Sequence, residues 1–306
     1  MKAELGPTRS TFQSHERLRI LKTVVAFLVI NQIDELPAVS IQSVLENSEC
    51  EIRVGYLNER DISQIEISPR VQFVKLQPIP NLDLSGVYKD FSENLFYQIV
   101  QLKWQLIQTL LDQDFEVVIY SDLDVIWISN PLPSLVHVFE QDSEIAIQIQ
   151  SFTTEPDKPR LCMGFVAFRN NLQTREIISV CEKNHTELLE QNPRLGDDDV
   201  MTKYYIENNC FSKIRLLPQS TFPVGSFLNL YTTRPIFPGL NAPKPYIFHL
   251  NYVVGLQNKR IMLRLISRKF KVKTSGMNHW FFLLLIKRLR FIFSTATRKL
   301  LALGRF

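Results

Sequence analysis

Apolar runs and amphipathic segments alternate along most of the chain. Short runs rich in Val, Ile, Leu and Phe, bounded by polar residues, predict buried strands over residues 24–30, 52–57, 71–76, 117–120, 162–168 and 245–250. Residues 144–150 alternate apolar and polar side chains, which predicts a strand with one wet face. Three- and four-residue apolar spacing predicts helices over residues 91–111 and 172–189, and shorter helices over 37–45 and from 200 onward. This order predicts an α/β fold with an open, mostly parallel sheet flanked by helices.

The length of 306 residues allows one large α/β domain or two small ones. With 45% hydrophobic and 22% charged residues, wholesale disorder is excluded. We expect a polar N-terminal arm over residues 1–20, one domain over 21–265 and a basic amphipathic tail over 266–306. Residues 1–19 lack the apolar stretch of a secretory signal, and the apolar run 24–30 is far shorter than the about 20 residues that span a bilayer.

The four cysteines, Cys50, Cys162, Cys181 and Cys210, lie far apart in the sequence. No pair has the spacing of a metal site or a redox motif. We therefore expect free thiols in the core and a reducing compartment.

The charge of the chain is strongly asymmetric. From Asn208 to Phe306 there are 17 Lys and Arg and no Asp or Glu, so all 31 acids precede this third. Within it, Trp280 to Phe293 combines an apolar run with Lys287, Arg288 and Arg290. This segment predicts a helix lying at an anionic membrane surface, although a helix docked on the domain fits the same pattern. No nucleic-acid-binding module is recognisable, so we expect no nucleic-acid partner.

Two carboxylates, Asp122 and Asp124, stand between apolar runs and are separated by Leu123. In an extended segment they would face one side, at the carboxyl end of a predicted parallel strand, where α/β proteins bind ligands. Unpaired buried carboxylates are costly, and Mn²⁺ or Mg²⁺ is the strongest partner for them. An ordinary acidic turn is the alternative, because a bare Asp-x-Asp recurs by chance.

The helical Lys103-Trp104 pair followed by residues 119–133, IYSDLDVIWISNPLP, resembles the nucleotide-diphospho-sugar transferase family, the GT-A-fold glycosyltransferases grouped as family 77. The resemblance covers about residues 24–265. It implies a metal-dependent transfer of a sugar from a nucleotide diphosphate to an acceptor hydroxyl, with retention of configuration. It also implies that the Lys103 side chain points toward Asp122 or a phosphate and not into solvent. Ser121 is expected to bind the nucleotide-sugar donor.

The last predicted strand delivers His249, which is followed by Gly255 and Lys259. A histidine at a strand end can offer a neutral nitrogen to a metal, so His249 is a candidate third ligand beside Asp122 and Asp124. Gly255 would let the backbone approach a phosphate, and Lys259 would place a positive charge on it. The alternative is a structural histidine.

Further candidates depend more on the resemblance. Gly164 interrupts a predicted strand, which marks a bulge or a close backbone approach, and the resemblance places it beside the donor sugar. Asp198 and Asp199 precede a predicted helix and either cap it or contact sugar and acceptor hydroxyls. Residues 222–225, Phe-Pro-Val-Gly, resemble a family turn on the acceptor side. His185 is expected to be an exposed charge near a helix end, without a role.

We therefore expect a metal-dependent glycosyltransferase with a nucleotide-sugar donor and a glycan or other hydroxyl acceptor. A nucleotidyl or phosphoryl transferase could use the same acids, and a non-enzymatic membrane-surface binding protein could depend on the basic tail alone. The absence of an apolar N-terminal anchor favours a cytoplasmic protein, peripheral at the inner membrane face.

Overall fold

The computed structural model describes residues 21–30, 36–80, 94–150, 159–192, 194–225, 244–251, 253 and 256–270. Its strands are β1 (Thr23–Leu28), β2 (Glu51–Tyr56), β3 (Val71–Lys75), β4 (Val117–Ser121), β5 (Val125–Trp127), β6 (Ile145–Ile149), β7 (Leu161–Arg169), β8 (Ile214–Leu216) and β9 (Ile247–His249). Its α-helices are α1 (Leu36–Asn47), α2 (Asn94–Leu111), α3 (Leu132–Glu140), α4 (Leu172–Gln191), α5 (Asp197–Glu207) and α7 (Leu256–Phe270). Each strand and helix predicted within these ranges is present, although the start of α5 and the exposure of β6 differ from the predictions.

In the described residues, the central sheet has seven strands in the order β3-β2-β1-β4-β7-β6-β8. The pairs β1–β2, β2–β3, β1–β4 and β6–β8 are parallel, whereas β7 runs antiparallel to both β4 and β6. The predicted mostly parallel sheet is confirmed. Its carboxyl edge is where β4 ends and the Asp122–Asp124 turn begins.

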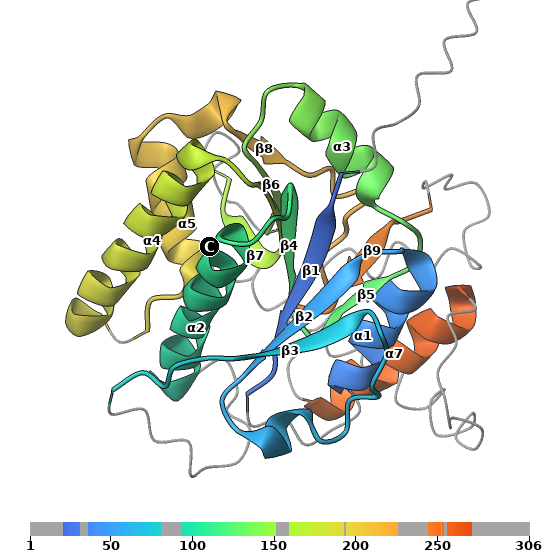
Figure 1. Cartoon of the computed structure of the whole chain (residues 1–306). Helices are drawn as coiled ribbons and strands as arrows, with labels where there is room; N and C mark the ends of the chain where they lie inside the picture. Colours follow the sequence, from blue (N-terminus) through green and yellow to red (C-terminus); the bar gives the residue numbers. More distant parts are fainter. Residues whose placement is uncertain are drawn as a thin grey trace, which may run out of the picture.

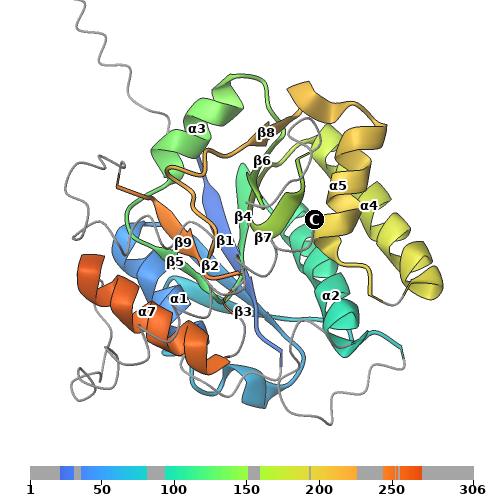
Figure 2. The ribbon, with the colours of Figure 1, turned by 180° about the vertical axis from the view of Figure 1, so that it is seen from behind.

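Helices cover both faces of this sheet (Figures 1 and 2). On β1, Val24 and Ala26 pack with α2, α4 and α5, while Val25 and Phe27 pack with α1 and α3. A strand covered on both sides buries every side chain, and this is why its sequence is continuously apolar rather than alternating. The same three-layer packing accounts for the apolar runs of β4 and β7.

A second, two-stranded sheet joins β5 to β9 in antiparallel register, with Val125 opposite His249. One side of it packs against α7, through Ile126, Phe248 and Leu263 among others. Figure 2 shows β5, β9 and α7 together beside the carboxyl edge of the main sheet. This small sheet places His249 beside the turn that bears Asp122 and Asp124.

The predicted wet face of residues 144–150 is wrong. Ala146 and Gln148 are 0% exposed and Glu144 is 4% exposed. The reason is that both faces of β6 are covered: Ala146 packs with Leu135 and Phe139 of α3 and with Phe222, and Ile145 and Ile147 pack in the cluster on the opposite face. The polar residues gain partners instead of water, since Gln148 donates to the Phe222 carbonyl and Glu144 accepts from Asn171.

Cys50, Cys162, Cys181 and Cys210 are free thiols, as predicted, and the first three are buried. Burial raises the pKa of the Cys50 thiol to about 11 and that of Cys181 to about 12. The reducing compartment stays a prediction. So do the domain boundaries: the arm 1–20 and residues 271–306 of the tail lie outside the described residues.

Candidate active site

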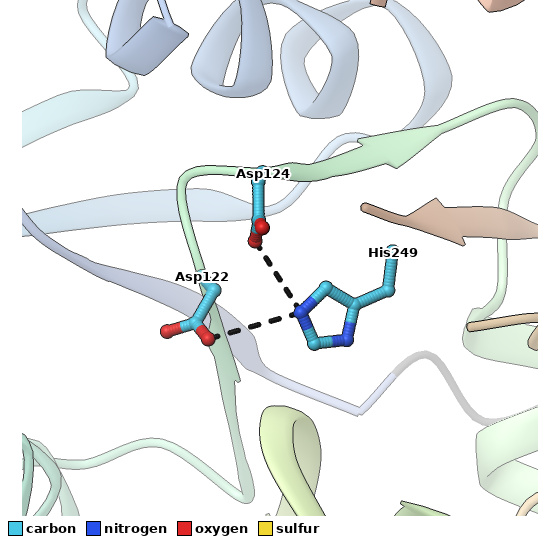
Figure 3. Close-up of side chains that lie close together, drawn as sticks. All are labelled: Asp122, Asp124 and His249. Carbon is cyan, nitrogen blue, oxygen red and sulfur yellow. Dashed lines mark ion pairs between the residues drawn. The ribbon is translucent and has the colours of Figure 1, made fainter. Parts of the chain in front are cut away.

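The acid pair lies on a turn rather than on an extended strand. Strand β4 ends at Ser121, and the Val125 N–H donates to the Asp122 carbonyl at 3.1 Å, which closes a tight turn. The extended geometry assumed from the sequence is therefore wrong, yet both carboxylates still point to one side (Figure 3). The partly buried Leu123 packs into the neighbouring apolar clusters.

Two serines of α1 hold this turn, and neither was singled out from the sequence. The Ser40 hydroxyl donates to the Leu123 carbonyl in a short hydrogen bond. The Ser43 hydroxyl oxygen accepts the Trp127 N–H at 3.0 Å. Both serines are 0% exposed, so the turn is anchored to a helix that packs against the sheet.

The three predicted metal ligands come together, and we call Asp122, Asp124 and His249 the metal cluster. The His249 Nε2 atom lies 3.3 Å from Asp124 Oδ1 and 3.9 Å from Asp122 Oδ2 (Figure 3). One ligand atom from each residue falls within 4.8 Å of the others. His249 and Asp124 are buried, and Asp122 is partly exposed.

The donor set of the metal cluster fits Mn²⁺ or Mg²⁺. Two carboxylates and one imidazole suit a borderline-hard divalent ion, and the partly exposed Asp122 leaves access for further ligands. The Asp122–His249 distance of 3.9 Å is longer than a hydrogen bond, and the Asp124–His249 distance of 3.3 Å is near the outer limit of one. The identity of the ion stays a prediction.

Lys259 of α7 also faces the metal cluster. Its Nζ atom lies 2.6 Å from Asp124 Oδ2. Burial on its own would raise the pKa of Asp124, but the charges of Lys259 and His249 outweigh it and hold the pKa well below its ordinary value. Asp124 is therefore ionised at neutral pH. Gly255, the predicted phosphate contact just before α7, lies outside the described residues.

On the other side of the turn lies a buried ion-pair group, which we call the lysine cluster: Lys103, Asp122 and Asp197. The Lys103 Nζ atom is 3.0 Å from Asp122 Oδ1 and 2.8 Å from Asp197 Oδ2. Burial alone would lower the pKa of Lys103, but these two carboxylates raise it well above its ordinary value. The expectation that Lys103 points toward Asp122 is confirmed, whereas Asp197 was not predicted.

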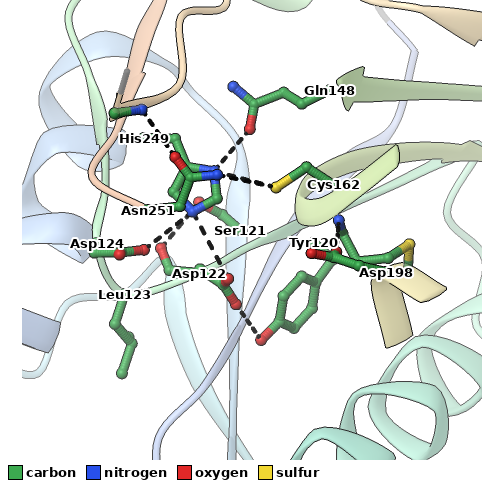
Figure 4. Close-up of polar contacts among 12 residues, drawn as sticks. Tyr120, Ser121, Asp122, Leu123, Asp124, Gln148, Cys162, Asp198, His249 and Asn251 are labelled. Carbon is green, nitrogen blue, oxygen red and sulfur yellow. Dashed lines mark hydrogen bonds and ion pairs between the residues drawn. The ribbon is translucent and has the colours of Figure 1, made fainter. Parts of the chain in front are cut away.

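Tyr120 supports the same group from below. Its hydroxyl donates to Asp122 Oδ1 at 3.1 Å (Figure 4). The Lys103 ammonium lies 4.8 Å from the centre of its ring. Ser121, the neighbouring predicted donor contact, is 0% exposed, and its hydroxyl lies 3.5 Å from the Asp122 carbonyl. Contact between Ser121 and a donor stays a prediction.

Gly164 of β7 is packed directly against the metal cluster. A Cβ atom at this position would lie 2.0 Å from His249 Cε1 and 2.7 Å from Asp122 Oδ2. The Gly164 carbonyl also accepts the Asp122 N–H at 2.7 Å. The close backbone approach expected for this glycine is therefore present, and it is an approach to the ligand residues themselves.

Three consecutive acids, Asp197, Asp198 and Asp199, which we call the acidic triplet, form the first turn of α5. The prediction that this helix begins at residue 200 is therefore wrong. Asp199 accepts the Gly196 N–H and pairs with Arg160 at 2.7 Å. Asp198 accepts from the Met163 N–H at 2.5 Å and from Gln150 at 2.6 Å. Asp199 therefore caps the helix, as the capping alternative predicted, whereas Asp198 is bound by Met163 of β7 and by Gln150 instead. Their contacts with sugar or acceptor hydroxyls stay predictions.

Burial, and then the charge of Asp197, raise the pKa of Asp198 to about 7, although the Met163 N–H acts in the opposite direction. Asp197 is itself a member of the lysine cluster, and Asp198 is close enough to it that the charges of Lys103 and Asp122 also act on the pKa of Asp198.

The turn over residues 222–225, Phe-Pro-Val-Gly, is hydrogen-bonded to β9 and to Asn251 just after it. The Pro223 carbonyl accepts the His249 N–H at 3.2 Å, and the Gly225 N–H donates to Asn251 Oδ1 at 2.8 Å. A Cβ atom on Gly225 would lie 1.9 Å from the Asn251 carbonyl oxygen, so only glycine fits. The turn therefore supports His249. An additional role on the acceptor side stays a prediction.

The expectation of an exposed His185 is wrong. His185 is 0% exposed, and its Nδ1 accepts the indole N–H of Trp104 at 2.9 Å. Its Nε2 lies 3.1 Å from the Leu195 carbonyl. Burial lowers its pKa. The helix-end position suggested solvent, but α2 packs across α4 there, so this histidine is an internal link that fastens the Lys103-bearing helix.

An α/β sheet that gathers two acids, an imidazole and a lysine at its carboxyl edge has the layout of an enzyme that binds a nucleoside diphosphate through a divalent cation. The chain matches the family model described as nucleotide-diphospho-sugar transferase over residues 65–263. The chain belongs to this family, and it is accordingly a glycosyltransferase that uses a nucleotide sugar. The finer assignment to family 77 stays a prediction.

Two solved structures are reported as similar to this chain. The galactosyltransferase LgtC, solved with donor and acceptor sugar analogues, has a TM-score of 0.51 at 12% identity, covering 81% of this chain and 99% of that one. Mouse xyloside xylosyltransferase 1, in its apo form, has a TM-score of 0.46 at 13% identity, covering 75% and 97%. The first supports the predicted GT-A-like fold. A search of curated proteins found no match.

Of the helices in the described part of the chain, none is both long enough and apolar enough to cross a membrane.

Proposed function

We propose that this protein is a Mn²⁺- or Mg²⁺-dependent glycosyltransferase that moves a sugar from a nucleotide diphosphate to an acceptor hydroxyl with retention of configuration. The observation that carries the metal dependence is the convergence of Asp122, Asp124 and His249 at the end of β4. These residues would hold the ion. When bound, it would neutralise the diphosphate as the bond to the sugar breaks.

The other residues of the site have electrostatic and positioning roles in this proposal. Lys259 lies 2.6 Å from Asp124 and would add a positive charge beside the leaving nucleotide. Lys103 fixes one oxygen of Asp122 at 3.0 Å, so the other oxygen stays turned toward His249. Ser121 and Gly164 would line the donor side, and Gly255 would bring backbone close to a phosphate.

Asp198 and Asp199 are proposed to contact hydroxyls of the donor sugar or the acceptor. Asp198 lies closer to the two clusters and is the better candidate, because its pKa of about 7 lets it exchange a proton near neutrality. An NMR time course of the anomeric proton of the product tests retention, and formation of the inverted anomer would contradict it.

The central experiment measures nucleoside diphosphate release from a panel of nucleotide sugars, with and without Mn²⁺, for the wild type and for Asp124→Asn. We expect one donor to be turned over in a metal-dependent way, and a loss of at least about 10³-fold in the variant, because Asn removes the charge that would bind the ion. Unchanged metal dependence in Asp124→Asn would contradict the proposal. Release of pyrophosphate or inorganic phosphate would indicate nucleotidyl or phosphoryl transfer instead.

We further propose that the basic tail holds the protein at an anionic membrane surface on the cytoplasmic side. The support is compositional: Lys287, Arg288 and Arg290 lie within an apolar segment of the sequence. Replacing these three residues by Gln in the full chain should abolish sedimentation with phosphatidylserine vesicles and leave donor hydrolysis in solution unchanged. Equal sedimentation of both proteins would refute the membrane role without touching the transferase activity.

A further inference from the structure

Gln148 of β6 is a fully buried polar residue next to the metal cluster. Its side chain is 0% exposed, and its amide touches two groups: Nε2 donates to the Phe222 carbonyl at 3.0 Å, and Oε1 lies 2.9 Å from His249 Nδ1 (Figure 4). The alternating pattern of residues 144–150 predicted a solvent-exposed position for Gln148, with no functional role. Because the NH₂ group and the oxygen of this buried amide each have a partner, the side chain is held in one orientation.

The two contacts fix which way the amide points. The Phe222 carbonyl can only accept, so it must face the NH₂ group of Gln148 and not the oxygen. The amide oxygen is thereby directed at His249. Because an amide oxygen can only accept, the ring nitrogen that faces it must carry a proton.

In a neutral imidazole one nitrogen carries the proton and the other carries a lone pair. With the proton on Nδ1, the lone pair is on Nε2, which is the atom that faces Asp122 and Asp124 at 3.9 and 3.3 Å. Cys162 is compatible with this arrangement. Its sulfur lies 3.6 Å from Nδ1 and accepts the Asn251 amide at 3.5 Å, so it acts as a second, weak acceptor on the same side.

We propose that Gln148 is a positioning residue for the metal cluster: it selects the His249 tautomer whose Nε2 can bind a cation. This inference depends on the proposed metal-dependent function for its purpose, but the tautomer itself is a property of the metal-free protein. In other metal-binding histidines, the ring N–H that does not face the metal donates to a carboxylate or a backbone carbonyl. Here the buried Gln148 amide oxygen would accept that hydrogen bond.

The test compares two replacements of Gln148 in the full-length protein. Gln148→Met keeps the length of the side chain and removes the acceptor. Gln148→Glu keeps an acceptor toward His249 and loses the donor to Phe222. Gln72→Met, on an exposed position of β3, is the matched control for the same chemical change away from the site.

The first measurement is a long-range ¹H–¹⁵N correlation spectrum of metal-free protein labelled at histidine, recorded at about pH 9, well above the ordinary pKa of imidazole. A His249→Asn sample assigns the resonances. The wild type, Gln148→Glu and Gln72→Met should show the Nδ1–H tautomer of His249, and Gln148→Met should show a mixture or the other tautomer. An Nε2–H tautomer in the wild type, or an unchanged one in Gln148→Met, would overturn the role of Gln148.

The second measurement is a Mn²⁺ titration followed by electron paramagnetic resonance. We expect Gln148→Met to weaken binding by about 10- to 100-fold, with Gln148→Glu close to the wild type. Equal weakening in both variants, matching their loss of thermal stability, would mean that Gln148 only fills space. Failure of the wild type to bind Mn²⁺ would instead contradict the proposed metal dependence, and the tautomer spectra would still decide the role of Gln148.

Discussion

Asp122 belongs to two charge clusters that differ in one respect. In the lysine cluster a buried ammonium lies 2.8 and 3.0 Å from two carboxylates, so the charges are matched by protein groups. In the metal cluster two carboxylates approach an imidazole nitrogen at 3.3 and 3.9 Å, too far for strong mutual contacts. In the lysine cluster one cation lies between two carboxylates, whereas in the metal cluster two carboxylates face one imidazole nitrogen and Lys259 lies 2.6 Å from the second oxygen of Asp124.

The difference suggests a division of labour. The lysine cluster fixes one oxygen of Asp122 and ties α2, β4 and α5 together, so its loss should be felt mainly in stability. In the proposed function the metal cluster would hold the ion, so its loss should reduce activity more than stability. Variants that separate these two outcomes test the comparison.

The largest effect is expected for Lys103→Met. It would leave Asp122 and Asp197 without their buried counter-charge, and breaking a buried ion pair in this way costs about 3–5 kcal/mol of unfolding free energy. Urea unfolding measures it. Lys203→Met is the control, because Lys203 is half-exposed and pairs only loosely with Glu207, so its change should stay within about 0.5 kcal/mol. Equal stabilities for the two variants would remove the distinction between the clusters.

The next effect is expected for Gly164→Ala. The added methyl group would meet the His249 ring at 2.0 Å and push it or Asp122 out of place. We expect about a 100-fold loss of metal-dependent turnover, as second-layer disruption of a metal site commonly gives. Gly196→Ala is the matched control, since its Cβ would meet nothing nearer than 3.8 Å. Wild-type turnover in Gly164→Ala would show that the site tolerates displacement of these ligands.

Lys259→Met should have a smaller effect and should distinguish binding from catalysis. Lys259 is a partly exposed cation beside Asp124, so we expect about a tenfold loss of kcat/KM for the donor, worth about 1.4 kcal/mol. Mn²⁺ affinity should not fall, because Asp124 loses a competing cation. Lys259→Arg should retain most of the activity. A loss of Mn²⁺ binding in Lys259→Met would show that the lysine organises the cluster instead.

The last prediction concerns the pH dependence of stability. Burial and the charge of Asp197 raise the pKa of Asp198 to about 7, against about 4 in the unfolded chain. The folded state therefore binds this proton more tightly, so the contribution is fully present below about pH 4 and is lost as the pH rises to about 7. In Asp198→Asn this part of the decline should disappear. Unfolding free energies of both proteins at about pH 5 and about pH 8 measure it, and parallel curves would contradict the assignment.

Much of the fold followed from the sequence because the main sheet is covered on both faces. Such strands are continuously apolar, as at residues 24–30 and 117–120, and they stand out from amphipathic helices. The acid pair was found because it interrupts two apolar runs. His249 was found because it ends a strand and is followed by a lysine.

The wrong predictions of exposure have a common physical cause, because segments that are distant in the sequence pack over these positions. Gln148 and His185 carry polar side chains at positions where a local pattern predicts solvent. The Phe222 carbonyl and His249 lie against Gln148, and α2 covers His185. Asp197 was missed as the partner of Lys103 because the pairing crosses from α2 to α5. A helix-capping explanation was also sufficient for all three acids of the triplet.

The pairing of β5 with β9 has a consequence for the lifetime of the folded protein. Asp124 precedes β5 and His249 ends β9, so the two ligands are joined only after the chain between them has closed a very long loop. Such distant contacts form late in folding. An ion that binds both residues should then leave the folding rate unchanged and slow unfolding, because it stabilises contacts absent from the transition state. Urea unfolding kinetics with and without Mn²⁺ measure this. On this view the ion governs how long a folded molecule survives and has little influence on how quickly one is made.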